Sequence, residues 1–187
     1  MRRFAVTTMC AGLLLLRLAP TATIAAADES NPIRRVLTLT NTERLKAGLK
    51  PLVLSDQLSQ AAQTYSQVLA TSGCFGHTCG PTPKFEERAG QAGYTGWNAL
   101  GENVGAGSPT PEAVVAAWMS SPSHRANMLS PNFSEIGIGL VIGGGSYGTY
   151  WTQEFGARPD DLEQRVAQLA PAVPAEEPAP PEDTTEN

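Results

Sequence analysis

Two apolar runs near the C-terminal end of the chain, separated by a glycine-rich tetrapeptide, constrain the fold most. The runs cover residues 136–142 and 147–155, and Gly143-Gly144-Gly145-Ser146 lies between them. Short apolar runs are typical of strands, and a glycine-rich connection of this length is typical of a hairpin loop. The pattern therefore predicts two adjacent antiparallel strands, and residues 97–104 are a candidate third strand.

Helical patterns occupy most of the chain before these runs. Asn31-Pro32 has the form of an N-cap followed by a first-turn proline, and it predicts a helix that ends near Gly48. The expected apolar stripe of this helix contains Ile33, Val36, Leu37, Thr40 and Leu45. A second helix is expected from Ser55 or Asp56 to Gly73, because apolar residues recur there at helical spacing.

Three shorter helices are also predicted. The first begins at Thr82-Pro83 and runs through Ala89, and another begins at Thr110-Pro111. The inward face of the latter is expected to carry Val114, Val115, Trp118 and Met119. A third begins at Ser121-Pro122, with Ser121 as an N-cap and Pro122 in the first turn. Helices around a small antiparallel sheet define an α+β fold.

The N-terminal residues 1–27 have the pattern of a signal peptide. Arg2 and Arg3 precede an apolar stretch that ends at Leu18, and Ala25-Ala26-Ala27 supplies the small residues of a cleavage site. The stretch contains Arg17 and is shorter than the roughly 20 apolar residues that a membrane-spanning helix needs, which makes a retained anchor the weaker interpretation. The protein is therefore expected to be secreted, in the extracellular space or the cell wall.

Composition divides the rest of the chain into a domain at residues 28–156 and a tail at residues 157–187. The tail has six prolines, eight acidic residues and no aromatic residue, so we expect most of it to be disordered. The whole chain carries a net charge of −5 at pH 7, and much of the negative charge lies in the tail. Nucleic acid requires a basic face on its partner, so it is excluded as a partner on charge.

Cys74 and Cys79 flank His77 and would remain after removal of the signal peptide. In an exported protein, two cysteines this close are expected to form a disulfide. The alternative is a metal-binding pair, which usually needs further Cys or His ligands.

The chain has only two histidines, His77 and His124, and Glu102 lies between them in the sequence. Histidine titrates near neutral pH and is a common metal ligand, so the three residues are candidates for an acid–base site or a divalent-cation site. The alternatives are surface or cap histidines and a buried structural carboxylate. Sequence spacing alone does not show that the three side chains meet.

Eight short motifs follow one another between residues 33 and 156: Asn41-x-x-Arg44, Pro51-Leu52, Phe75-Gly76-His77, Gly93-Tyr94, Gly101-Glu102-Asn103, Trp118-x-x-Ser121-Pro122-x-His124-Arg125, Ile136-Gly137-Ile138-Gly139 and Tyr150-Trp151-Thr152-Gln153-x-Phe155-Gly156. The ordered set resembles the CAP superfamily, also called the SCP domain, in its bacterial branch. The resemblance implies a three-layer αβα sandwich and a cleft with two His and two Glu, where some members bind zinc or another divalent cation. It assigns His77, His124 and Glu102 to that cleft, and it places Ser121 where the second Glu usually stands.

Two classes of function remain open, and a third possibility is that the domain only supports attachment or assembly. The favoured one is a non-catalytic module that binds a cell-envelope component, a lipid or a protein. The other is a cation-assisted hydrolase of peptide, glycan or phosphodiester bonds that uses His77, His124 and Glu102. Ser121 is not favoured as a nucleophile, because the sequence supplies no oriented third group. The sequence does not decide whether Glu135 and Glu154 face the cleft.

Overall fold

The computed structural model describes residues 30–159. The predicted signal peptide at residues 1–27 lies outside this part of the chain, and so does the predicted tail from residue 160 onward. Among the helices of residues 30–159, none is both long enough and apolar enough to cross a membrane.

A four-stranded sheet forms the middle layer, in the order β1-β3-β4-β2. The expected hairpin is confirmed as β3 (Glu135–Ile142) and β4 (Thr149–Ala157), and β2 (Ala99–Ala106) pairs antiparallel with β4. The sheet was expected to be wholly antiparallel, but the two-residue strand β1 (Val53–Leu54) adds to β3 in parallel. Two residues carry too little periodicity to be recognised in a sequence.

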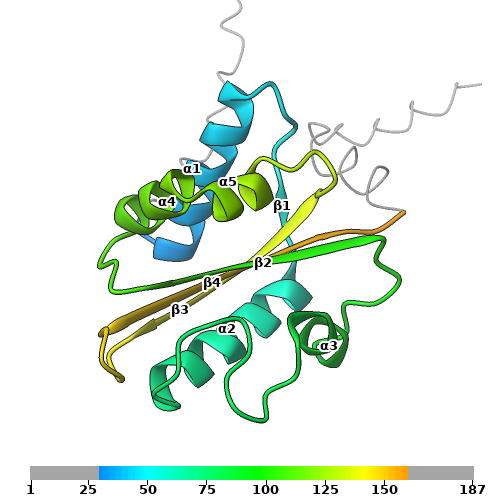
Figure 1. Cartoon of the computed structure of the whole chain (residues 1–187). Helices are drawn as coiled ribbons and strands as arrows, with labels where there is room; N and C mark the ends of the chain where they lie inside the picture. The colour runs from blue at the N-terminus through cyan, green and yellow to red at the C-terminus, as the bar shows by residue number, and fades with distance from the viewer. Residues whose placement is uncertain (1–29, 160–187) are drawn as a thin grey trace, which may run out of the picture.

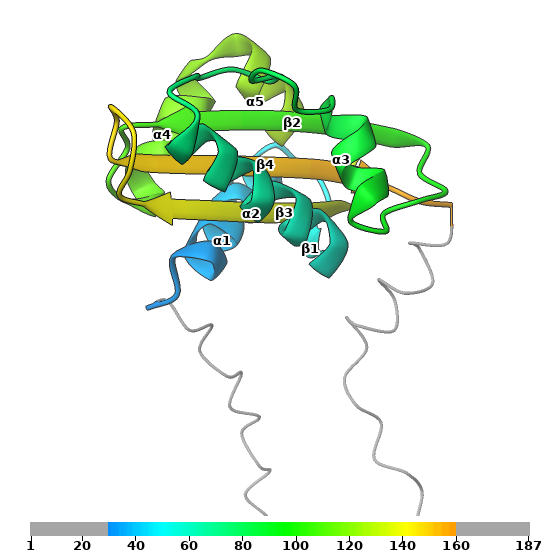
Figure 2. The same ribbon diagram turned by 90° about the horizontal axis from the view of Figure 1, so that it is seen from below.

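Helices cover both faces of the sheet, as Figure 1 and the view from below in Figure 2 show. One face is covered by α2 (Asp56–Thr71) and α3 (Phe85–Gln91). The other is covered by α1 (Pro32–Lys46), α4 (Pro111–Ser120) and α5 (Pro122–Met128). The chain therefore has the predicted α+β fold, a three-layer αβα sandwich.

Local capping chemistry fixes the beginnings of three helices. The side chains of Asn31, Ser55 and Thr110 each accept a hydrogen bond from a backbone N–H in the first turn of α1, α2 and α4. Ser121 occupies the N-cap position of α5, but its Oγ lies 3.4 Å from Ser123 Oγ and caps no backbone amide.

The third helix begins later than predicted, at Phe85 instead of Thr82-Pro83. Thr82 is engaged in a turn: its Oγ1 donates to the Cys79 carbonyl and accepts from the Cys79 N–H. The hydroxyl that was expected to open the helix therefore closes the preceding loop.

Helix α1 differs from its predicted stripe at one position. Leu45 is 62% exposed, whereas the neighbouring Arg44 is 1% exposed. The guanidinium of Arg44 donates to four backbone carbonyls, those of Lys50, Met128, Ser130 and Phe133. A buried guanidinium is tolerated there because its donors are satisfied.

Helix α2 packs directly on β3 because two positions of that strand lack side chains. Ile136 and Ile138 point into the core on the α1 side, and the alternating residues Gly137 and Gly139 face α2. A Cβ atom at Gly137 would overlap the backbone of Leu58 and Ser59. The glycines therefore determine how close the helix lies to the sheet.

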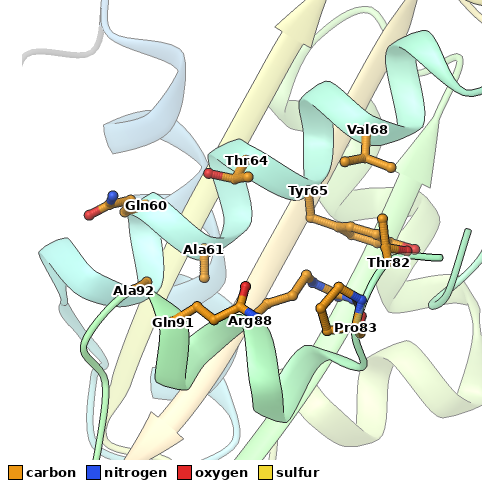
Figure 3. Close-up of a pocket in the computed structure, with 10 residues that line it drawn as sticks. All are labelled: Gln60, Ala61, Thr64, Tyr65, Val68, Thr82, Pro83, Arg88, Gln91 and Ala92. Carbon is orange, nitrogen blue, oxygen red and sulfur yellow. Dashed lines mark hydrogen bonds between the residues drawn. The ribbon is translucent and has the colours of Figure 1, made fainter.

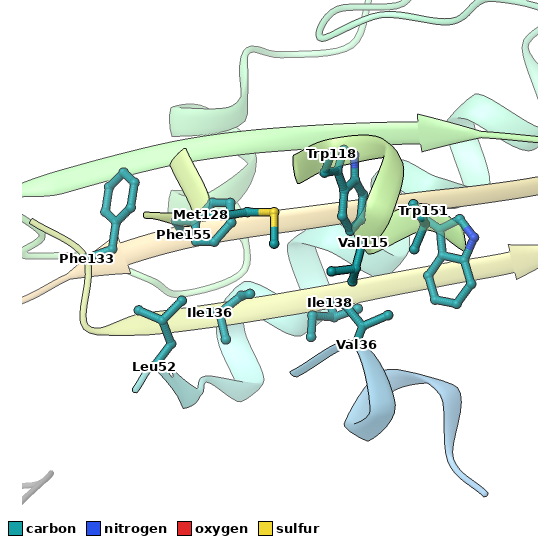
Figure 4. Packing of buried hydrophobic residues seen from close by; sticks show 11 residues of the cluster. Val36, Leu52, Val115, Trp118, Met128, Phe133, Ile136, Ile138, Trp151 and Phe155 are labelled. Atoms are coloured by element: carbon teal, nitrogen blue, oxygen red, sulfur yellow. The ribbon is translucent and has the colours of Figure 1, made fainter. Parts of the chain in front are cut away.

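The main apolar core lies between the sheet and helices α1, α4 and α5 (Figure 4). It contains Trp118, which was expected to face inward, and also Trp151 and Phe155, each no more than 1% exposed. Met119, which was predicted to face inward, is only partly buried. The buried members of this core are Val36, Leu52, Val114, Val115, Trp118, Met128, Phe133, Ile136, Ile138, Trp151 and Phe155.

Candidate functional site

The site begins with two glutamates on neighbouring strands. The register of β2 and β4 places Glu102 directly opposite Glu154, so both side chains lie on the same face of the sheet. Both residues are buried. Like charges directly opposite each other destabilise a sheet, so this pair requires a counter-charge.

Arg88 of α3 supplies that counter-charge. Its Nη2 donates to Glu102 Oε2 and lies 3.6 Å from Glu154 Oε1. Its Nη1 donates to the carbonyls of His77 and Pro83, at 3.2 and 2.6 Å. The guanidinium also lies 3.5 Å from the centre of the Tyr65 ring, a favourable cation–π contact. The loop before α3 and the two strands are therefore joined through one side chain.

We call His77, Arg88, Glu102 and Glu154 the polar cluster. Glu154 is its least solvated member, with no exposed surface. Neither of its carboxyl oxygens has a hydrogen-bond partner among the described residues. Burial raises the pKa of Glu154 well above its ordinary value, and the charge of Glu102 raises it further, against the opposing effect of Arg88. The cluster thus favours the protonated form of Glu154.

His77 reaches the cluster from a short closed loop. A disulfide joins Cys74 and Cys79, whose Cα atoms are 5.7 Å apart. Tyr65 Oη donates to the Gly76 carbonyl at 2.6 Å, and burial raises the pKa of Tyr65 to about 12, so this donor keeps its proton. These contacts fix the backbone on both sides of His77.

We expect that replacing both cysteines by serine lowers the free energy of unfolding by about 2 kcal/mol, because a short disulfide loop restricts the unfolded chain only modestly. Urea unfolding of the oxidised protein and of the double serine variant measures the difference. Reduction of the disulfide in the wild-type protein should lower the free energy of unfolding by the same amount. Identical unfolding curves for the oxidised protein and the double serine variant would contradict the prediction.

The His77 ring contacts Glu102 and also faces solvent. Its Nδ1 lies 2.7 Å from Glu102 Oε1, and its side chain is 55% exposed. The hydrogen bond to Glu102 raises the pKa of His77 above 6.5, although burial acts in the opposite direction. One ring nitrogen is therefore held by the protein, and the exposed edge of the ring is accessible to a ligand.

The contact predicts a pH dependence. A raised pKa in the folded state means that the His77–Glu102 interaction stabilises the fold fully below pH ~6.5, and that this contribution is lost as the pH rises through the folded-state pKa. NMR titration should give a His77 pKa above 6.5 in the wild-type protein. In Glu102→Gln the value should fall, since the amide lacks the carboxylate charge. The same His77 pKa in both proteins would show that Glu102 does not raise it.

His124 lies in α5, which packs against β2, the edge strand that carries Glu102. Its carbonyl accepts from Asn103 Nδ2 at 3.1 Å, and Asn127 Nδ2 donates to the Glu102 carbonyl at 3.0 Å. Burial lowers the pKa of His124, and the charge of His77 lowers it further. Of the two histidines, His77 is the one whose ring bonds to Glu102.

The neighbouring residues have other roles. Asn103 lies in β2, and its Nδ2 also donates to Gln153 Oε1. Glu135, whose direction was open, binds Tyr94 Oη and Arg158 and is not part of the polar cluster. The sequence also left the direction of Glu154 open, and the structure places Glu154 in the polar cluster.

A small pocket adjoins the polar cluster between α2 and α3 (Figure 3). Its volume is about 170 Å³, and its walls include Ala61, Tyr65, Pro83 and Arg88. Ligand sites usually measure about 300–1,000 Å³, so this pocket accommodates only a small group.

The described residues do not form a metal centre by themselves. Within residues 30–159, no three His, Cys, Asp or Glu side chains lie together in a way that could hold a metal ion. His77 Nδ1 and both oxygens of Glu102 already have protein partners. Zinc sites in proteins have three or four protein ligands, so the arrangement does not fit a zinc site.

Arg88 is the residue that sequence reasoning missed. It is the only Lys or Arg between Lys84 and Arg125, a stretch that contains Glu102. Had the register of Glu102 and Glu154 been known, a buried pair of carboxylates would have required a cation, and Arg88 was the nearest candidate.

Comparison with protein families and curated proteins gives a consistent result. Residues 37–155 match the model of the CAP family, described as the cysteine-rich secretory protein family. The uncharacterized protein YkwD of Bacillus subtilis is 40% identical over 135 residues, which cover 72% of this chain and 51% of YkwD. The uncharacterized membrane protein YlbC of the same organism is 25% identical over 122 residues, which cover 65% of this chain and 33% of YlbC. The chain thus spans about half or less of these relatives.

Solved structures share the fold. An extracellular protein of Bacillus anthracis that contains an SCP domain superposes with a TM-score of 0.61 at 24% identity, over 68% of this chain and 40% of that one. An outer surface protein of Borrelia burgdorferi superposes with a TM-score of 0.62 at 23% identity, over 70% of this chain and 96% of that one. With the family match across residues 37–155 and the sequence identity to YkwD, these similarities show that the chain belongs to the CAP family.

Proposed function

We propose that this protein is an extracellular CAP domain that binds a component of the cell envelope through the surface around His77 and His124, without catalysing a reaction. The proposal rests on the residues of the polar cluster and on the predicted signal peptide at residues 1–27. The extracellular B. anthracis protein and the B. burgdorferi outer surface protein support it as relatives in fold.

The state of Glu102 is the observation that carries the proposal. A general base or metal ligand needs a free carboxylate oxygen, but Oε1 of Glu102 contacts His77 and Oε2 accepts from Arg88. Ser121 stands where the resemblance places a second Glu. The exposed edge of His77 can instead donate to or accept from a ligand, with Glu102 orienting the ring.

Binding and turnover can be measured side by side. We expect the exported protein to bind an isolated cell-envelope fraction saturably, and His77→Ala to weaken that binding. Peptide, glycan and phosphodiester substrates should remain intact with or without Zn²⁺. Zinc-dependent hydrolysis that His77→Ala abolishes would overturn the proposal in favour of a hydrolase.

Restoring a carboxylate at position 121 tests the incomplete cation site. We expect Ser121→Glu to tighten Zn²⁺ binding by about tenfold, since an additional anionic oxygen attracts the ion and can ligate it. The Ser121 hydroxyl caps no backbone amide, so the fold should tolerate the change. Calorimetric titration measures the affinity.

Ser120→Glu adds the same charge one residue earlier and is the matched control, with no expected change. Equal affinities of Ser121→Glu and the wild type would show that position 121 does not face the histidines.

A further inference from the structure

Two exposed aromatic side chains contact each other, and one of them, Phe75, lies two residues before His77 in the chain. Phe75 is 44% exposed and Tyr147 is 54% exposed, and their ring centres are 5.7 Å apart. Phe75 belongs to the disulfide loop two residues before His77, and Tyr147 belongs to the loop between β3 and β4. In Figures 1 and 2, that loop and the C-terminal end of α2 lie at the same end of the molecule.

The protein holds both rings in place. Tyr147 contacts the ring of the buried Tyr150 edge-on, and its backbone N–H donates to Tyr150 Oη. The loop that carries Phe75 is closed by the Cys74–Cys79 disulfide and by the hydrogen bond from Tyr65. Rings that are already ordered lose little entropy when a ligand binds, so the pair is pre-organised for contact.

The surroundings of this pair carry few charges. Residues 64–83, 103–111 and 136–153 contain no Asp, Glu, Lys or Arg. They supply the C-terminal half of α2, the two loops and most of the adjoining strands. An anionic polymer or an anionic membrane would require basic residues here. An uncharged ligand suits this surface, and His77 at its edge offers hydrogen bonding.

Another exposed apolar residue nearby belongs to a different surface. Ile142 is 76% exposed, but side chains alternate along β3, and Val141 is the residue that packs with Tyr150 on the α2 side. Ile142 therefore points to the other face of the sheet. The aromatic pair and Ile142 therefore do not form one continuous apolar surface of the kind that inserts into a membrane.

We propose that Phe75 and Tyr147 form a platform for a sugar ring of a neutral cell-envelope glycan, with His77 bonding to its hydroxyl or amide groups. The face of an aromatic ring is partly negative, and the C–H bonds on the flat side of a pyranose ring are partly positive, so the two stack. This inference rests on the proposed function, because it names the ligand class of the same surface.

Chitotetraose, an uncharged oligosaccharide of N-acetylglucosamine, is the probe. We expect NMR shifts of Phe75, His77 and Tyr147 that saturate with a Kd on the order of 1 mM. Phe75→Ala and Tyr147→Ala should each weaken binding by about tenfold, as loss of a stacking ring does elsewhere. The variants Phe75→Tyr and Tyr147→Phe keep the rings and should retain binding within about threefold of the wild type.

Trp97→Ala and Ile142→Ala are matched controls, because both residues are exposed and apolar but lie outside the platform. The glycan assignment is overturned if the control variants lose as much affinity for chitotetraose as the platform variants do. It is also overturned if the NMR shifts of the wild-type protein do not saturate. Platform-dependent binding to phosphatidylcholine vesicles without chitotetraose binding overturns it in favour of a membrane surface. If the double variant Phe75→Ala with Tyr147→Ala still binds the cell-envelope fraction, the platform is rejected but the proposed function stands. If the wild-type protein does not bind that fraction, both proposals are rejected.

Discussion

Gly137→Ala is expected to lower the free energy of unfolding by about 3–5 kcal/mol, at the upper end of single substitutions. A methyl group at this position meets the main chain of Leu58 and Ser59, which cannot rotate away as a side chain can. Helix α2 would have to lift from β3, and the contacts of Leu58, Ala61 and Ala62 with the sheet would weaken. Thermal unfolding should show a midpoint lower by roughly 10–20 °C.

Gly90→Ala is the matched control. Gly90 lies in α3 and is exposed, and a Cβ atom added there would have no neighbouring atom within 4 Å. Alanine has the higher helix propensity, so stability should stay the same or rise by up to about 1 kcal/mol. Equal stability of Gly137→Ala and the wild type would show that α2 does not rest on β3 as closely as described.

Arg88→Met should cost a similar amount, about 3–5 kcal/mol, for an electrostatic reason. Removing the cation from a buried ionic group leaves the carboxylate of Glu102 uncompensated, with the buried carboxyl group of Glu154 beside it. The unpaired carboxyl groups then favour protonation in the folded state, so the variant should lose stability as the pH rises. Chemical unfolding at pH 5 and pH 7.5 should show the larger deficit at pH 7.5.

Two further variants separate charge from packing. Arg88→Met with Glu154→Gln prevents Glu154 from ionising beside Glu102 and should recover part of the loss. Arg34→Met changes an exposed arginine of α1 and should leave stability within about 0.5 kcal/mol of the wild type. If the stability lost in Arg88→Met depends neither on pH nor on the added Glu154→Gln substitution, Arg88 has a packing role only.

Sequence predicted the local elements of this fold well. The caps at Asn31, Ser55 and Thr110, the glycine-rich loop that begins at Gly143 and the strands beside it depend on neighbouring residues, and the structure contains each of them. The loop is longer than predicted, because β4 begins at Thr149 and not at Tyr147. The ordered motifs also identified the family correctly. In α1, local reasoning failed because of a distant partner: Arg44, not Leu45, is buried because carbonyls from residues 128–133 surround its guanidinium.

The candidate site was decided by tertiary structure. The sequence singled out His77, Glu102 and His124 but could not show which of them meet, and the structure places His77 against Glu102. It also adds Arg88 and Glu154, since the β2–β4 register puts two carboxylates side by side and α3 carries a cation to them. A cap or a turn depends on residues a few positions apart and is therefore visible in the sequence. The charge balance of a buried site depends on strand register and helix placement, which arise only when the whole domain packs.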